Sequence, residues 1–137
     1  MDKLTQPAFI DFHDAVISSV KLHGDSSATI SFENLNCFYA VGPDEYEVWA
    51  CAADISCYGL RALELKGRLD SSVWVSHGSM LDAQQSEVLA LSTEESQISS
   101  LSLTLLSGTE IRLSVGSARL ETLKRLEQLE KWTGPLR

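Results

Sequence analysis

The chain of 137 residues suits one domain, and its 44% hydrophobic and 22% charged residues are typical of a globular protein rather than a disordered one. Its 19 acidic and 11 basic side chains give a formal net charge of -8, which repels phosphate backbones and argues against nucleic-acid binding. No apolar run approaches the ~18 residues of a membrane span or resembles a signal peptide, so we expect no membrane partner.

The three cysteines, Cys37, Cys51 and Cys57, indicate a reducing compartment. Their number is odd and none forms a C-x-x-C pair, so neither a disulfide framework nor a zinc site is indicated. All three lie in apolar stretches, which favours buried free thiols in a cytoplasmic protein.

Two alternating runs open the chain. Val16, Val20 and Leu22 share one side of the first run, and Ala28, Ile30 and Phe32 share one side of the second. A short polar turn at residues 24–27 separates them, which predicts an antiparallel hairpin.

The run from Tyr46 to Ala53 is apolar at both odd and even positions, which predicts a central strand covered on both faces. Alternation returns at residues 63–69, 73–75, 98–106 and 111–115. Ser107-Gly108 divides the last two runs into the clearest hairpin of the chain.

After Gly116 the period changes to three. Ser117 can cap a helix, and Thr133-Gly134-Pro135 can end one. The spacing predicts a helix whose broad buried face carries the leucines Leu120, Leu123, Leu126 and Leu129.

These elements predict one α+β domain over residues 1–137. We expect an antiparallel meander sheet of about six to eight strands, with its apolar face covered by the single C-terminal helix.

His13-Asp14 is the first candidate for chemistry, because a carboxylate beside a histidine can support general-base catalysis in a hydrolase-like cleft, with His77 as a further member. Adjacent residues of an extended strand point to opposite sides, however, so we expect these two side chains not to bond each other. The alternative is that one of them bonds nearby backbone at the start of the first strand. We therefore assign no catalytic residue.

A metal site would have to combine His13, His23 and His77 with Asp11 or Asp14. No H-x-H or H-x3-H pair holds two of these ligands on one element, so we expect neither a metal nor a cofactor.

The segment from residue 37 to 47 combines aromatic and acidic side chains, a composition that suits a protein interface. Alternatively, its aromatic residues are strand core and its acids a solvated turn. The proposed contact residues are Phe38, Tyr39, Asp44, Glu45, Tyr46 and Glu47.

Phe12-His13-Asp14-Ala15, followed by an alternating strand, resembles the start of small uncharacterised bacterial proteins that open with F-H-D-S/A. "ATISFENL", "EYEVWACAA" and "LELKG" extend the resemblance over about the first half of the chain. Similar families are grouped with the immunity proteins of polymorphic toxin systems, in which a β-rich domain binds and blocks a toxin. The resemblance transfers no ligand residue.

We therefore expect a non-enzymatic protein that binds a basic partner protein and neutralises a toxin by occlusion. Two alternatives stay open: the hydrolase at His13 and Asp14, and a small-ligand carrier with a partly open apolar sheet face. An unpaired edge strand could also pair two copies into a homodimer.

Overall fold

The structure is a computed structural model that describes residues 6–68 and 73–133, with side chains described as far as Leu129. It is all-β, and the described residues contain no helix. The strands are β1 (Phe9–His23), β2 (Ser27–Gly42), β3 (Glu45–Tyr58), β4 (Ala62–Lys66), β5 (Val73–Leu81), β6 (Glu87–Val88), β7 (Ser96–Gln97), β8 (Ser100–Leu105), β9 (Glu110–Ser114) and β10 (Ser117–Thr133).

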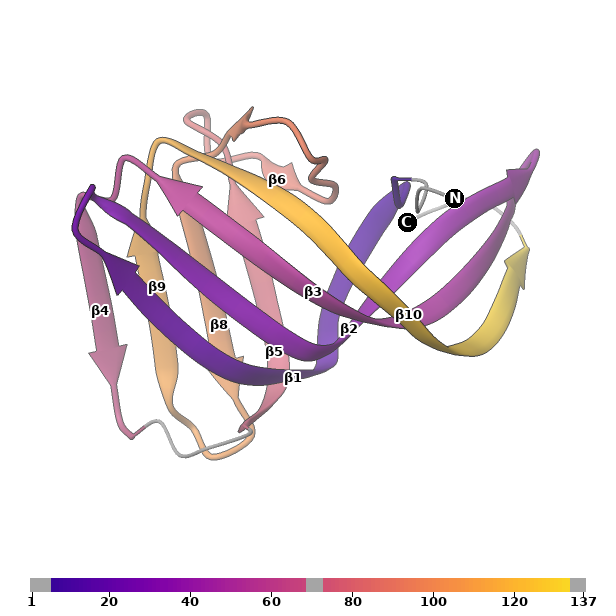
Figure 1. The fold of residues 1–137 in the computed structure, drawn as a ribbon, viewed down its shortest axis with the longest axis horizontal. Coiled ribbons are helices and arrows are strands. Elements are labelled where there is room, and N and C mark those ends of the chain that lie inside the picture. Colours follow the sequence, from indigo (N-terminus) through magenta and orange to yellow (C-terminus); the bar gives the residue numbers. More distant parts are fainter. Residues whose placement is uncertain (1–5, 69–72, 134–137) are drawn as a thin grey trace.

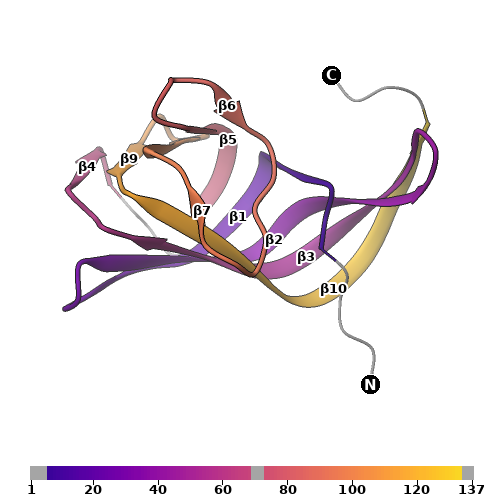
Figure 2. The same ribbon diagram turned by 90° about the horizontal axis from the view of Figure 1, so that it is seen from above.

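The strands form one hydrogen-bonded antiparallel sheet in the order β4-β9-β8-β5-β1-β2-β3-β10-β7, and β6 pairs with β5. The sheet bends sharply between β5 and β1, which in the described residues are paired at Val16–Trp74 and Ile17–Val73. As a result β4, β9, β8 and β5 form a second layer over β1, β2, β3 and β10 (Figures 1 and 2).

The two layers bury their apolar faces against each other, which removes the alternating apolar side chains of each strand from water. Both layers contribute to this core, whose fully buried members include Ile30, Ile55, Met80, Leu101, Leu103, Ile111, Leu113 and Leu120.

The layer formed by β1, β2, β3 and β10 extends past the second layer at one end. Figure 1 shows β2, β3 and β10 continuing together beyond β5 as a curved three-stranded ribbon. We call this ribbon the arm, and define it as residues 35–51 of the β2–β3 hairpin with residues 121–133 of β10.

The expected hairpins are confirmed. β1 pairs with β2 across the polar turn, β8 pairs with β9 around Ser107-Gly108, and β3 is a central strand between β2 and β10. The meander order is wrong, because β1 lies beside β5 and β10 lies beside β3 rather than β9. The described residues form ten strands instead of six to eight.

The α+β class is also wrong, because the expected C-terminal helix is strand β10. Ser117, the expected helix cap, pairs instead with Tyr58 of β3 and Gln97 of β7. The sheet face that the helix was expected to cover is covered by the second layer.

The physical reason lies in β3, whose residues Ala53, Ile55 and Cys57 are fully buried. Buried backbone N–H and C=O groups need partners, and without β10 one edge of β3 would lack them. This requirement overrides the helix propensity of a leucine-, glutamate- and lysine-rich segment, which amounts to only tenths of a kcal/mol per residue.

The three-residue spacing of the leucines is absorbed by β-bulges. Register shifts occur between Thr122 and Lys124, between Arg125 and Glu127, and between Gln128 and Glu130. Each shift leaves one leucine without an opposite residue on β3, namely Leu123, Leu126 or Leu129.

Candidate functional site

The six proposed contact residues all lie in the arm, but on different sides of it. Tyr39 is opposite Glu47 in the β2–β3 register, and these two share one face. Phe38 and Tyr46 lie on the other face. Asp44 and Glu45 are at the tip, where Asp44 has a φ of 55°, a left-handed conformation that aspartate tolerates in turns.

An aromatic cluster covers one face of the arm. Phe9, at the start of β1, stacks on Phe38 with ring centroids 4.0 Å apart, and Tyr46 meets Phe9 edge-on at 6.0 Å. All three rings are half-buried. Phe9 is a member that the sequence did not assign to this surface, because its neighbour in space is 29 residues away along the chain.

Tyr39 is buried on the opposite face, so its assignment as a contact residue is not supported by its position. The guanidinium group of Arg125 lies 4.1 Å from the Tyr39 ring centroid and 5.4 Å from that of Trp49. The indole N–H of Trp49 donates to Glu47 at 3.2 Å. The sequence did not assign Arg125 or Trp49 to this site, because residue 125 was expected on a helix rather than opposite Cys51 of β3.

The three cysteines are free and buried, as expected. The S–H of Cys37, the hydroxyl of Tyr39 and the guanidinium of Arg125 together lower the pKa of Cys51 to about 7, although burial opposes this change. The hydrogen bond to Cys51 and burial raise the pKa of Cys37 well above its usual range. Cys51 is fully buried, so this readily ionised thiol is closed off from solutes.

The outer edge of β10 is the longest open strand edge of the arm. β7 pairs with it only at Ser117 and Ala118, and the Leu120 N–H donates to the Ser92 carbonyl at 2.7 Å. Beyond Leu120, no strand in the described residues pairs with this edge. The bulged leucines are about half exposed: Leu123 by 53%, Leu126 by 49% and Leu129 by 47%.

His13 and Asp14 lie at a corner of β1. Four residues, 12–15, separate the pairs Asp11–Asn36 and Val16–Asn34, and Asp14 has a φ of 65°. This departure from an extended chain brings His13 Nδ1 to 3.1 Å from Asp14 Oδ2, so the expectation that the two side chains are poorly placed to bond each other is wrong. The bond to backbone that we expected from His13 or Asp14 is made instead by Asp11, whose carboxylate accepts from the His13 N–H at 2.9 Å.

The histidines do not gather at this corner. His13 and Asp14 are 66% and 61% exposed, His23 contacts Thr29 at the far end of β1, and His77 contacts Ser76 on β5. Within the described ranges, no group of three or more His, Cys, Asp or Glu side chains could hold a metal ion. The arrangement therefore offers an exposed His–Asp pair that the other two histidines do not join.

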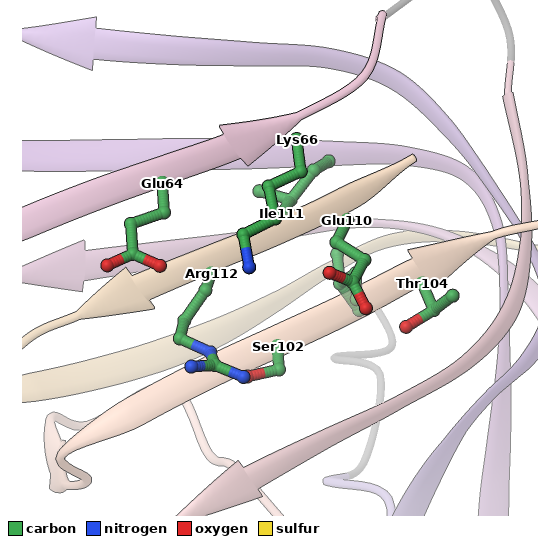
Figure 3. Close-up of a pocket in the computed structure, with 8 residues that line it drawn as sticks. Glu64, Lys66, Ser102, Thr104, Glu110, Ile111 and Arg112 are labelled. Atoms are coloured by element: carbon green, nitrogen blue, oxygen red, sulfur yellow. The ribbon is translucent and has the colours of Figure 1, made fainter. Parts of the chain in front are cut away.

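The outer face of the second layer is polar. Glu64 lies opposite Arg112 and Lys66 opposite Glu110, which alternates charge across β4 and β9 (Figure 3). The hollow between these side chains has a volume of about 40 Å³, room for a few water molecules. Such a surface is typical of a solvated sheet face.

Comparisons with protein-family models, with curated proteins and with solved structures found no match to this chain. A search of the described residues for a helix long and apolar enough to span a membrane also found none.

Proposed function

We propose that the chain is a protein-binding domain whose arm holds a basic partner protein. The observation that carries this proposal is the open edge of β10 with its half-exposed leucines Leu123, Leu126 and Leu129. An extended partner segment can add to such an edge as a further strand, because the unpaired N–H and C=O groups form a template.

The charge of the neighbouring hairpin supports a basic partner. Between residues 22 and 60 the sequence has no lysine or arginine, and its six acids are Asp25, Glu33, Asp44, Glu45, Glu47 and Asp54. This stretch therefore has a formal charge of -6, against -8 for the whole chain. Three of the six acids, Asp44, Glu45 and Glu47, lie in the arm, and the β10 part of the arm adds three acids and three basic residues, which leaves the arm a formal charge of -3. A negative field at a projecting element accelerates encounter with an oppositely charged protein.

The mode of action is occlusion, with affinity from the β10 edge and the aromatic cluster and steering from the acidic tip. The resemblance of Phe12-His13-Asp14-Ala15 to the families grouped with immunity proteins makes a toxin the first class of partner to test. In that role the arm blocks the toxin's working surface, and no residue of this chain performs catalysis.

The test begins with candidate partners: the products of genes adjacent to this one, and proteins recovered from the source cell at low salt. Binding rates are then measured for two pairs of variants. D44N/E45K changes the charge of the tip by +3, and E87Q/E94K makes the same change on the second layer and its loop. L126K alters the β10 edge, whereas L106K alters a leucine that is 67% exposed at a turn.

We expect D44N/E45K to slow association by about tenfold or more at low salt, with the effect shrinking as salt is added. L126K should raise the dissociation rate, and both control variants should bind like the original chain. Equal rates for all four variants, or the absence of any partner under both searches, would contradict the proposal.

A further inference from the structure

A polar groove lies at one end of the second layer, away from the arm. Ser100 lies opposite Ser114, and Ser102 lies opposite Arg112, so these four share the outer face of β8 and β9. Arg61 borders the groove from the connection between β3 and β4, and Gln85 borders it from a turn. The groove has a volume of about 460 Å³ and is open to solvent.

The two arginines of the groove have no acidic partner among residues 6–68 and 73–133. Arg61 donates from Nη2 to the Val115 carbonyl at 2.9 Å. In the part of the chain that the structure describes, no carboxylate oxygen lies within 4.0 Å of either guanidinium group. Figure 3 shows Arg112 turned toward Ser102 and away from Glu64, the acid opposite it on β4.

The hydroxyl groups beside them are also available. Ser100, Ser102 and Ser114 make no side-chain hydrogen bond to the described residues, whereas the nearby Ser99 donates to Leu81 and Asp82 carbonyls. Three hydroxyl groups and two guanidinium groups that have no carboxylate partner among the described residues thus line one open volume.

Among the described residues, no acid lines this groove. Asp82 borders a neighbouring hollow of about 420 Å³, but its carboxylate already accepts from the Gln84 and Ser86 N–H groups at 2.9 and 3.0 Å. Lys66 and Arg119 also have no carboxylate oxygen within 4.0 Å among the described residues, so what distinguishes Arg61 and Arg112 is their place beside three serine hydroxyls in one groove. Guanidinium groups bind carboxylate and phosphate oxygens through paired hydrogen bonds, and serine hydroxyls can complete such a site.

We propose that this groove binds a small anionic ligand through a phosphate or carboxylate group held by Arg61, Arg112 and the three serines. The inference is independent of the proposed protein-binding function, because it concerns the other layer. The groove is open to solvent, so we expect a simple anion to bind weakly and a larger ligand to gain further contacts with Gln85 and the adjoining hollow.

The test uses inorganic phosphate and succinate as probes on the full chain, with chloride at matched ionic strength as the reference. Binding is followed by calorimetry and by the melting temperature. R112Q removes an exposed side chain that forms no hydrogen bond or ion pair with the described residues, so the fold should be retained. R119Q is the control, because Arg119 is on β10 and lies over the Tyr58 ring, away from the groove. E64Q removes the acid opposite Arg112.

We expect saturable binding of at least one probe, weakened by about fivefold or more in R112Q, unchanged in R119Q and strengthened in E64Q. Binding of phosphate alone would assign a phosphorylated ligand, and binding of succinate alone a carboxylate ligand. No saturable binding of either probe relative to chloride, or equal affinity in R112Q and R119Q, would overturn the inference.

Discussion

Gly78 marks the place where the corner of β1 crosses the second layer. It lies on β5 opposite Leu103 of β8. A Cβ atom added at Gly78 would lie 2.5 Å from Leu103 Cδ2, 3.0 Å from the Ser102 carbonyl oxygen and 3.1 Å from Phe12 Cβ. The Ser102 oxygen is a backbone atom, and the position of Phe12 Cβ is fixed by its own backbone. The third neighbour, Leu103, is buried in the core. The neighbours of Gly78 therefore cannot move aside at low cost.

We predict that G78A destabilises the chain. Overpacking a filled core costs about 1–3 kcal/mol, while replacing glycine by alanine returns about 0.4–1 kcal/mol through the unfolded state. G24A is the matched control, because Gly24 lies in the β1–β2 turn without a positive φ and with nothing within 4 Å of the added atom. Both variants share the unfolded-state gain, so their stabilities should differ by about 1–3 kcal/mol.

The assay is equilibrium urea unfolding followed by tryptophan fluorescence, with the slope against denaturant required to stay constant. G24A should be as stable as the original chain or slightly more stable. A G78A variant as stable as G24A would refute the close crossing of β1 over β5, and with it the two-layer arrangement.

Two further predictions test β10 and the core thiol. L120A should lower the free energy of unfolding by about 2–5 kcal/mol, because Leu120 is buried. L123A should change it by no more than about 0.5 kcal/mol, because Leu123 is 53% exposed. Similar losses in the two variants, measured by urea unfolding, would favour a helix with all its leucines buried. Burial raises the pKa of Cys57 from 9.0 to about 11. The neutral thiol therefore contributes fully to the free energy of unfolding below pH 9. This contribution is lost at about 1.4 kcal/mol per pH unit as the pH rises toward 11. The free energy of unfolding should therefore fall less steeply between pH 9 and 11 in C57A than in the original chain, and identical slopes would contradict a buried neutral thiol.

The hairpins could be predicted because their signals are local. The turns at residues 24–27 and 107–108 separate runs whose alternation already assigns a buried and an exposed face. The central position of β3 between two strands was also predictable from a run that is apolar at both parities. The expected cover on both faces is not equal, because Ala53 and Ile55 are buried whereas Ala52 on the other face is partly exposed.

The candidate site could be predicted only in part. The acidic tip at Asp44 and Glu45 follows from a turn signal and composition. Strand alternation places Phe38 and Tyr39 on opposite faces of the arm once the register is known. The open edge of β10 and the groove between Arg61 and Arg112 depend on strand neighbours that are far apart in the sequence.

The sequence by itself determined where the chain turns and which strands alternate, because those features depend on neighbouring residues. Only the tertiary structure decided the state of residues 117–133. Leucines at every third position are compatible with a helix face and with a strand that bulges at each leucine. The choice rests on the buried backbone of β3, whose open edge has no other partner in the described fold.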